Sequence, residues 1–339
     1  MRRFFCRCAF VFVTPCLLLL ALYVLLDPFK VVRDYDDYFP AEGMYPAVNK
    51  GMLSVRNFQR YFHVDSLDSF ILGSSMSIPY RVDEWRRYIG RDSRPFHFDS
   101  SGESLRSMRL KVEYLLNSGA DIENVLIVLP PDIFCYRDHL SVPYINPWQI
   151  DPDISWLRYH WTFIKNFYNR KFFRAYVMSR LLGRTDNVDI MGAMSTQPIV
   201  MDNPHNEESL PAFESEAICD ADSYRAHHHP AFVASVQPTE WVSFATPQGR
   251  SEVARIASLL NDNGVRYKVV IGPRLDKRYI NHLDLRILAD AFGAENVHDF
   301  SRSMAYVADD PVNFYDNVHY RPYVAAEIMR RVYAPSKGR

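Results

Sequence analysis

Short, largely apolar runs alternate along most of the chain with segments in which apolar residues recur every three or four positions. The clearest runs lie at residues 70–72, 125–129 and 267–271, and each stops at a glycine or a proline. Apolar runs of this length are typical of strands that helices cover on both faces. The alternation therefore predicts an α/β fold with three α/β/α layers, a parallel sheet and right-handed crossovers.

The predicted elements follow one another in chain order. Strands are expected at residues 69–73, 95–99, 125–129, 267–271 and 297–300. Helices are expected at residues 82–88, 105–116, 156–182, 247–260, 283–292 and 322–332. Thr246 and Pro247 suit an N-cap and the first position of a helix, and Gly119 and Gly264 suit helix C-termini.

The chain divides into three parts by composition. Residues 1–27 form a short cytoplasmic tip and an apolar membrane anchor, and residues 28–66 are expected to be a stalk that packs loosely against the domain. Residues 67–335 form the α/β domain. Its regular alternation is interrupted by an insertion at about residues 134–245, which is rich in Trp, Tyr, Phe and Pro.

The N-terminal segment has the pattern of a single transmembrane helix. Arg2, Arg3 and Arg7 precede an apolar run at residues 8–26, which is long enough to cross a bilayer. Basic residues before the run predict a cytoplasmic N-terminus and an extracytoplasmic, periplasmic domain. A cleaved signal peptide is the alternative, although no small-x-small cleavage site follows the run.

Composition excludes some functions. The chain is 48% hydrophobic with a formal net charge of -1, so it is globular and lacks the positive field of a nucleic-acid-binding protein. Cys135 and Cys219 are the two cysteines beyond the anchor, and a disulfide between them and two free thiols are both open. Three adjacent histidines at 227–229 cannot all face one ion, so no metal or other cofactor is expected.

A candidate catalytic group begins where the first strand ends. Residues 73–77 read Gly-Ser-Ser-Met-Ser, which places Ser75 between a buried strand and a helix. A serine hydroxyl needs an imidazole to take its proton and a carboxylate to orient that imidazole. Asp316 and His319 lie three residues apart before the last helix and supply both. The backbone N–H groups of Ser75 and Gly102 are the expected oxyanion donors.

Each of these residues also has an ordinary structural interpretation. Ser75 could cap a helix, and His319 and Asp316 could be turn residues at the surface. Ser77 is a second candidate nucleophile, but it lies farther from the strand end and suits a helix cap. Asp132, after the third strand, is expected to be a loop carboxylate rather than a catalytic acid.

The aromatic residues of the insertion have three open interpretations. They could stack on sugar rings, form the core of a lid, or rest on a membrane surface. The residues concerned are Trp148, Trp156, Tyr159, Trp161, Phe163, Phe167 and Tyr168.

Three blocks resemble those of the SGNH, or GDSL-type, hydrolases, whose fold is flavodoxin-like. Residues 73–77 are similar to the Gly-Asp-Ser-x-Ser/Thr block, Gly102 to the glycine after the second strand, and residues 316–319 to the Asp-x-x-His block. The resemblance covers residues 69–132 and 246–332. It implies that Ser75 is the nucleophile, His319 the general base and Asp316 its orienting partner.

Two departures from the family pattern stand out. Ser74 occupies the position where these hydrolases usually have aspartate, which leaves the nucleophile in place. No Gly-x-Asn-Asp block follows the third strand, where Pro130, Pro131 and Asp132 stand instead. The side-chain amide that donates to the oxyanion is therefore missing or comes from elsewhere.

With its N-terminal anchor, the chain is more similar to the membrane-anchored, DltD-like and alginate-O-acetylation-like members of the superfamily. That resemblance implies transfer of an acyl group, often acetyl, to a polysaccharide or cell-wall glycan, with a multi-pass membrane acyltransferase as donor. An esterase or deacetylase with the same triad is the first alternative. A non-catalytic glycan-binding or scaffold protein is the second.

Overall fold

The computed structural model describes residues 2–40, 45–182, 194–195, 199–211, 214, 221–227 and 236–334. For residues 2–9, 181–182 and 226–227 it describes the backbone alone. Cys219 and residues 228–229 lie outside the described residues.

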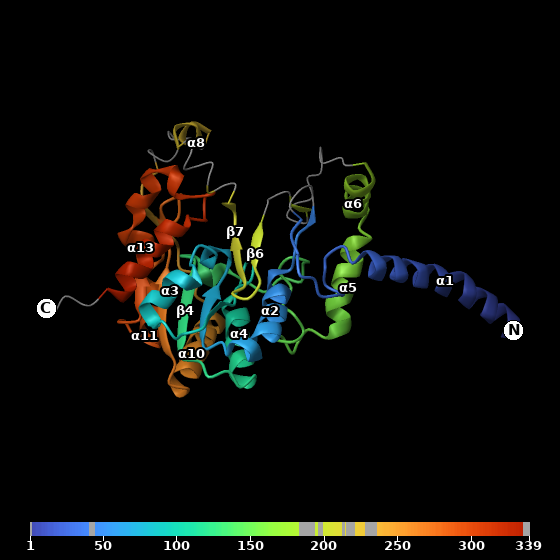
Figure 1. The fold of residues 1–339 in the computed structure, drawn as a ribbon, viewed down its shortest axis with the longest axis horizontal. Helices are drawn as coiled ribbons and strands as arrows, with labels where there is room; N and C mark the ends of the chain where they lie inside the picture. The colour runs from blue at the N-terminus through green and yellow to red at the C-terminus, as the bar shows by residue number, and fades with distance from the viewer. Residues whose placement is uncertain are drawn as a thin grey trace.

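One parallel sheet of five strands forms the centre of the molecule, in the order β11-β9-β4-β2-β3 (Figure 1). Its strands are β2 (Ser69–Gly73), β3 (Pro95–His97), β4 (Asn124–Leu129), β9 (Arg266–Ile271) and β11 (Val297–Asp299). All four pairings are parallel. The predicted α/β architecture is confirmed.

The position of β2 decides where a site can form. The chain passes from β2 to β3 on one side and then returns to β4 on the other. Connections that leave in opposite directions open a crevice at the carboxyl ends of the two central strands, which is where ligands bind in open α/β sheets. Residues 74–77 begin at this crevice.

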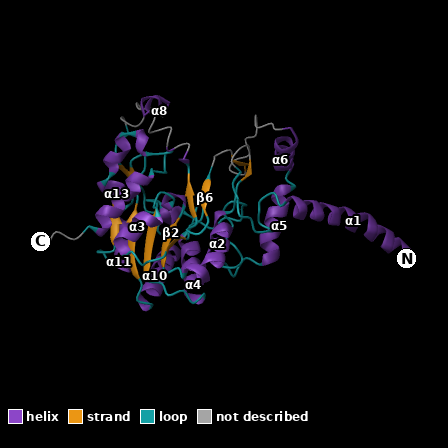
Figure 2. Cartoon of the chain, in the orientation of Figure 1, coloured by secondary structure: helices purple, strands orange, loops and turns teal. Residues whose placement is uncertain are grey.

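Helices cover both faces of the sheet, as predicted (Figure 2). Phe70 and Leu72 of β2 pack on one face, and Ile71 packs on the other. The first face is covered by α2 (Lys50–Asp65), α4 (Leu105–Asn117), α10 (Pro247–Asp262) and α11 (His282–Phe292). The second face is covered by α3 (Val82–Ile89) and α13 (Pro322–Tyr333).

The expected caps of these helices are present. The Thr246 side chain accepts a hydrogen bond from the Gly249 N–H, and Pro247 is the first residue of α10. Gly119 and Gly264 have φ values of 79° and 68°, which glycine adopts without steric cost.

Part of the expected stalk belongs to the core instead. Residues 50–65 form α2, whose Val55 and Phe58 are buried in the cluster on the first face of the sheet. The Asn49 carboxamide caps the helix by accepting from Met52 N–H at 2.8 Å. The prediction of loose packing over residues 28–66 is therefore wrong for this helix, because its apolar side completes the helical layer.

The insertion contains two helices where one was predicted at residues 156–182. They are α5 (Trp156–Phe167) and α6 (Arg170–Leu182). The Asn169 side chain accepts from the Lys171 N–H at 3.1 Å, which starts a new helix at that point. Phe163 and Phe167 are buried here together with Tyr23 and Phe29 from the N-terminal segment.

A hairpin of the insertion covers the β3 edge of the sheet. It consists of β6 (Val200–Asp202) and β7 (Glu207–Ser209), and the carbonyl oxygen of His205 in its turn accepts from His97 N–H at 2.9 Å. Asn206 takes a left-handed φ of 57° and is fully buried. Covering an edge strand in this way prevents it from pairing with other chains.

The remaining elements are short. They are β1 (Tyr45–Pro46) paired with β5 (Met194–Ser195), β8 (Thr239–Glu240) paired with β10 (Arg278–Tyr279), α8 (Ala221–His227) and α12 (Phe300–Ser303). Single turns of 3₁₀ helix occur at η1 (Ser75–Ser77), η2 (Ile133–Cys135), η3 (Ala305–Asp309) and η4 (Pro311–Asn313).

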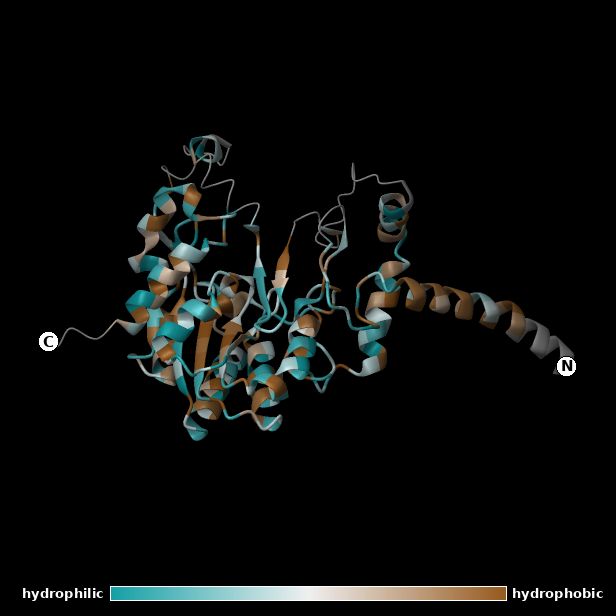
Figure 3. Ribbon diagram, in the orientation of Figure 1, coloured by the Kyte–Doolittle hydropathy of each residue, from teal (hydrophilic) through white to brown (hydrophobic). Residues whose placement is uncertain are grey.

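The first helix, α1 (Arg2–Leu26), projects away from the sheet, and Figure 3 shows that its surface is mostly apolar. Phe10, Phe12 and Leu25 are each more than 70% exposed. Over the part of the chain that the structure describes, no helix combines the length and apolarity that a membrane crossing requires.

Candidate active site

Ser75 follows the carboxyl end of β2, at the switch point between β2 and β4. β2 ends at Gly73, and an added Cβ there would lie 2.7 Å from the Val128 carbonyl oxygen, so glycine is needed for this close approach. Ser74 caps the turn that follows, and its hydroxyl faces the Met76 N–H at 3.5 Å. The Ser75 side chain is left half-buried.

Ser75, His319 and Asp316 form a continuous chain of hydrogen bonds. The His319 Nε2 lies 2.8 Å from the Ser75 Oγ, and its Nδ1 lies 2.7 Å from the Asp316 Oδ2. Because Nδ1 faces a carboxylate, a neutral imidazole carries its proton there and accepts from the serine hydroxyl at Nε2. The three residues that the sequence singled out are thus brought together, although they are far apart along the chain.

Asp316 is fixed by its own backbone. Its Oδ1 accepts from the N–H groups of Val318 and His319 at 2.7 and 2.8 Å. Burial raises the pKa of Asp316, but hydrogen bonds and charge from His319 outweigh that effect, and the net result is a lowered pKa. The carboxylate therefore stays ionised and can stabilise a charged imidazole.

The turn that carries Asp316 and His319 is held from two sides. The Tyr315 N–H donates to the His319 carbonyl oxygen at 2.7 Å, and the Leu275 N–H donates to that of Asn317 at 3.2 Å. Below the turn, the buried hydroxyls of Tyr80 and Tyr320 are 2.8 Å apart. These contacts tie the His319 turn to the loops after β2 and β9.

Ser75 and Gly102 both offer unused backbone donors. Within the described residues, the N–H groups of Ser75 and Gly102 make no hydrogen bond outside helix and strand ladders. Gly102 has a φ of 60°, and a Cβ there would lie 3.1 Å from the Tyr144 ring. Their role as oxyanion donors stays a prediction.

A buried ion pair adjoins the Gly102 turn. Glu103 follows Gly102, and its carboxylate lies 2.7 Å from the Lys111 Nζ, with both side chains fully buried. Burial raises the pKa of Glu103 to about 7 against the opposing charge of Lys111. Burial likewise lowers the pKa of Lys111. Sequence analysis did not single out this pair, because a Glu and a Lys eight positions apart show no pattern of their own.

Ser77, the rival nucleophile, is fully buried. Its hydroxyl donates to the Ser74 carbonyl oxygen at 2.7 Å and lies 2.9 Å from the His97 Nε2. Burial lowers the pKa of His97, so this imidazole stays neutral. Ser77 stabilises the turn under Ser75 and has no access to a substrate.

Asp132 follows β4 and faces a guanidinium. Its Oδ1 lies 3.8 Å from the Arg274 Nη1, and Arg274 also forms a two-pronged contact with Asp276. Burial raises the pKa of Asp132, while the charge of Arg274 opposes that rise. Sequence analysis missed Arg274, although its place just after β9 was a usable signal.

The structure also describes several aromatic residues of the insertion and one of the two cysteines beyond the anchor. Tyr159, Phe163 and Phe167 are core residues, whereas Trp156 and Trp161 are more than half exposed. Cys135 is a free thiol, and Cys219, its possible partner, lies outside the described residues.

The side chains of the three histidines at 227–229 also lie outside the described residues. Among the described residues, no group of three or more His, Cys, Asp or Glu side chains is arranged to hold a metal ion.

A comparison of the chain with protein-family models finds no match, and a comparison with curated proteins finds none either.

Proposed function

We propose that this chain is an SGNH-type serine acyltransferase that moves an acyl group, most simply acetyl, onto a polysaccharide or cell-wall glycan. The observation that carries the proposal is the continuous hydrogen-bonded chain from Ser75 through His319 to Asp316. Its place at the switch point of the parallel sheet adds support, because ligands of open α/β sheets bind at such points.

The proposed reaction has two halves. The Ser75 Oγ attacks the acyl carbonyl carbon while His319 Nε2 takes the hydroxyl proton, and that proton then passes to the departing alcohol or thiol. A glycan hydroxyl next attacks the acyl-serine ester and gives its proton to Nε2. Nε2 returns that proton to the Ser75 Oγ as the ester breaks. The N–H groups of Ser75 and Gly102 would stabilise the oxyanion in both halves.

The cellular setting is part of the proposal. The basic residues before the apolar run at 8–26 support an anchored chain with a cytoplasmic N-terminus and a periplasmic domain. A multi-pass membrane acyltransferase would then supply the acyl group from across the membrane.

Hydrolysis is the second candidate function. The His319 side chain is 29% exposed, so water can reach the imidazole that would activate the acceptor. An esterase or deacetylase would use the same residues with water in place of the glycan hydroxyl.

The test uses the full-length protein in detergent with a chromogenic acetyl ester, with and without an oligosaccharide. Ser75→Ala should lower the rate of ester cleavage about 10⁴-fold or more, because it removes the attacking atom. His282→Ala is a matched control, since His282 Nδ1 also lies 2.7 Å from a carboxylate, that of Glu240, but among the described residues no serine hydroxyl is bonded to its Nε2. It should leave the rate unchanged.

Mass spectrometry of the oligosaccharide then separates the two candidates. An added acetyl group supports transfer, and free acetate alone supports hydrolysis. If the wild type and Ser75→Ala cleave the ester equally slowly, the enzyme proposal fails and a non-catalytic scaffold or glycan-binding role is favoured.

A further inference from the structure

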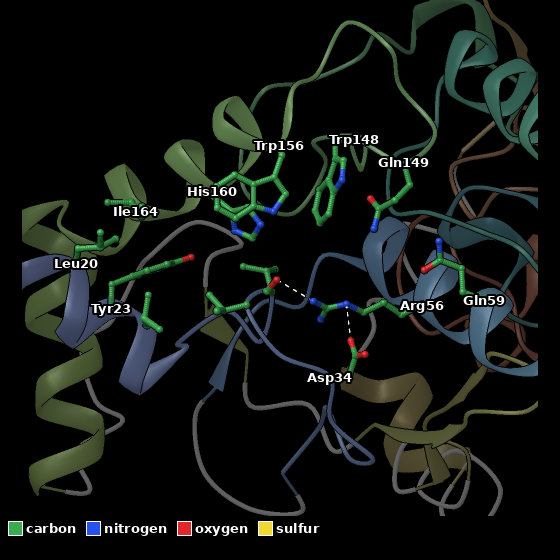
Figure 4. Close-up of a pocket in the computed structure, with 13 residues that line it drawn as sticks. Leu20, Tyr23, Asp34, Arg56, Gln59, Trp148, Gln149, Trp156, His160 and Ile164 are labelled. Carbon is green, nitrogen blue, oxygen red and sulfur yellow. Dashed lines mark hydrogen bonds and ion pairs between the residues drawn. The ribbon is translucent and has the colours of Figure 1, made fainter.

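A cavity lies between the first helix and the insertion, and neither Ser75 nor His319 lines it. It has a volume of about 460 Å³ and is bounded by α1, α5, the stretch after α1 and one side of α2 (Figure 4). This volume falls in the range of small-molecule sites in proteins.

The wall nearest α1 is apolar. Leu20 and Val24 of α1 and Ile164 of α5 form this wall, and Figure 4 shows Leu20 and Ile164 on the same side of the cavity. The next part of the wall is aromatic. It includes the rings of Trp156 and His160, whose centres are 4.4 Å apart. Val24 is 41% exposed, so the apolar wall is continuous with the exposed surface of α1.

Two buried polar groups at the cavity have no partner. Within the described residues, the Tyr23 hydroxyl and the Gln149 Oε1 make no hydrogen bond. Tyr23 is 1% exposed, and Figure 4 shows its hydroxyl pointing into the cavity. Leaving a buried polar group unpaired is unfavourable, so an oxygen-containing ligand at this place would satisfy the Tyr23 O–H.

The charged residues at the cavity are already neutralised. The Arg56 Nε lies 2.9 Å from Asp34, and its two Nη atoms donate to the carbonyl oxygens of residues 30, 31 and 33. Four of the five guanidinium N–H groups thus have protein acceptors, and one on Nη2 is left. The positive charge of Arg56 is already paired with Asp34, so the apolar wall rather than this guanidinium dominates the chemistry of the cavity.

We propose that this cavity binds the hydrocarbon chain of an amphiphile, whose ester, hydroxyl or carboxyl oxygen accepts from the Tyr23 hydroxyl. An alkyl chain suits the wall formed by Leu20, Val24 and Ile164, and it can enter from the exposed apolar surface of α1. An oligosaccharide fits less well, because its many hydroxyls need more free polar partners than Tyr23 and Gln149 provide. The inference is independent of the Ser75 chemistry.

The test is native mass spectrometry of the full-length protein released from a nonionic detergent. Three probes are added separately: 1-palmitoyl-lysophosphatidylcholine, palmitic acid and maltohexaose. We expect one retained palmitoyl chain per protein and no retained maltohexaose. Retention of both palmitoyl probes would show that the cavity recognises the alkyl chain alone. Retention of the lysolipid alone would show that it recognises the alkyl chain together with its ester group.

Two variants locate the binding. Ile164→Trp fills the cavity and should lower retention more than about tenfold, and Tyr23→Phe removes the hydroxyl and should weaken it about three- to tenfold. Leu157→Trp is the control, because Leu157 is on the same helix, 72% exposed and outside the cavity wall. Circular dichroism checks that each variant is folded.

The proposal is overturned if the wild type retains neither palmitoyl probe, or if maltohexaose is retained in their place. It is also overturned if folded Tyr23→Phe and Ile164→Trp retain as much lipid as the wild type.

Discussion

At the residue scale, the turn that follows β2 carries two serines in different surroundings. Ser75 and His319 are partly exposed and bonded to each other, whereas Ser77 and His97 form a similar pair that is wholly buried. The two serines are two positions apart in one turn, and both burial and the carboxylate of Asp316 distinguish the candidate nucleophile from the structural hydroxyl.

The ionisation of Glu103 should change the unfolding free energy of the protein as the pH changes. Its pKa is raised from 4.5 to about 7 in the folded chain, chiefly by burial, so the folded state holds this proton more tightly than the unfolded state. The stabilisation is complete below about pH 4.5 and is lost as the pH rises through about 7. The change in unfolding free energy over this range is on the order of 3 kcal/mol.

Glu103→Gln should remove this part of the pH dependence. Denaturant unfolding of the wild type and the variant between pH 4.5 and pH 7.5 measures it, and the wild type should lose stability relative to the variant as the pH rises. Glu113→Gln is the control, because Glu113 lies on the helix that follows Glu103 but is only half-buried, and it should keep the wild-type slope. Parallel slopes for wild type and Glu103→Gln would show that Glu103 does not titrate in this range.

At the element scale, the Asn206 side chain makes several of the contacts that hold the hairpin of β6 and β7 to the domain. The Asn206 amide donates to the Ser54 Oγ at 2.8 Å and to the His97 carbonyl oxygen at 2.5 Å. Its Oδ1 accepts from the Asn57 amide at 2.9 Å. Asn206 thus connects the hairpin, α2 and β3, and its left-handed backbone suits asparagine.

Asn206→Ala should lower the unfolding free energy by about 2–3 kcal/mol, because buried partners in α2 and β3 lose their hydrogen bonds. Asn203→Ala is the control in the same turn, since its amide donates to the Asp36 carbonyl oxygen at an exposed site, and it should cost less than about 1 kcal/mol. Urea unfolding measures both. Equal effects of the two changes would mean that the hairpin is not held to the core through Asn206.

At the scale of the whole molecule, the sequence predicted the parallel sheet because its strands are continuous apolar runs that end in glycine or proline. It also singled out Ser75, Asp316 and His319, since each stands at the boundary of a predictable element. It did not predict the burial of α2, where Lys50 and Asn57 interrupt the apolar pattern. These polar side chains are paired inside the fold, with Glu208 and Asn206 respectively.

Glu208 and Asn206 belong to the insertion. The contacts of the insertion with the sheet form only when the chain has folded, so they leave no pattern in the nearby sequence. The break between α5 and α6 at Asn169 and the pairing of Arg274 with Asp132 were not predicted, for the same reason. A local pattern does not reveal which polar residue a distant segment will satisfy.

The most direct test of the account is covalent labelling of the full-length protein with a fluorophosphonate, followed by peptide mass spectrometry. A serine activated by His319 should react, so the label should be found on Ser75 in the wild type. His319→Ala should lose it, and His282→Ala should keep it. Labelling of another serine, or equal labelling of Ser75 with and without His319, would contradict the proposed catalytic role.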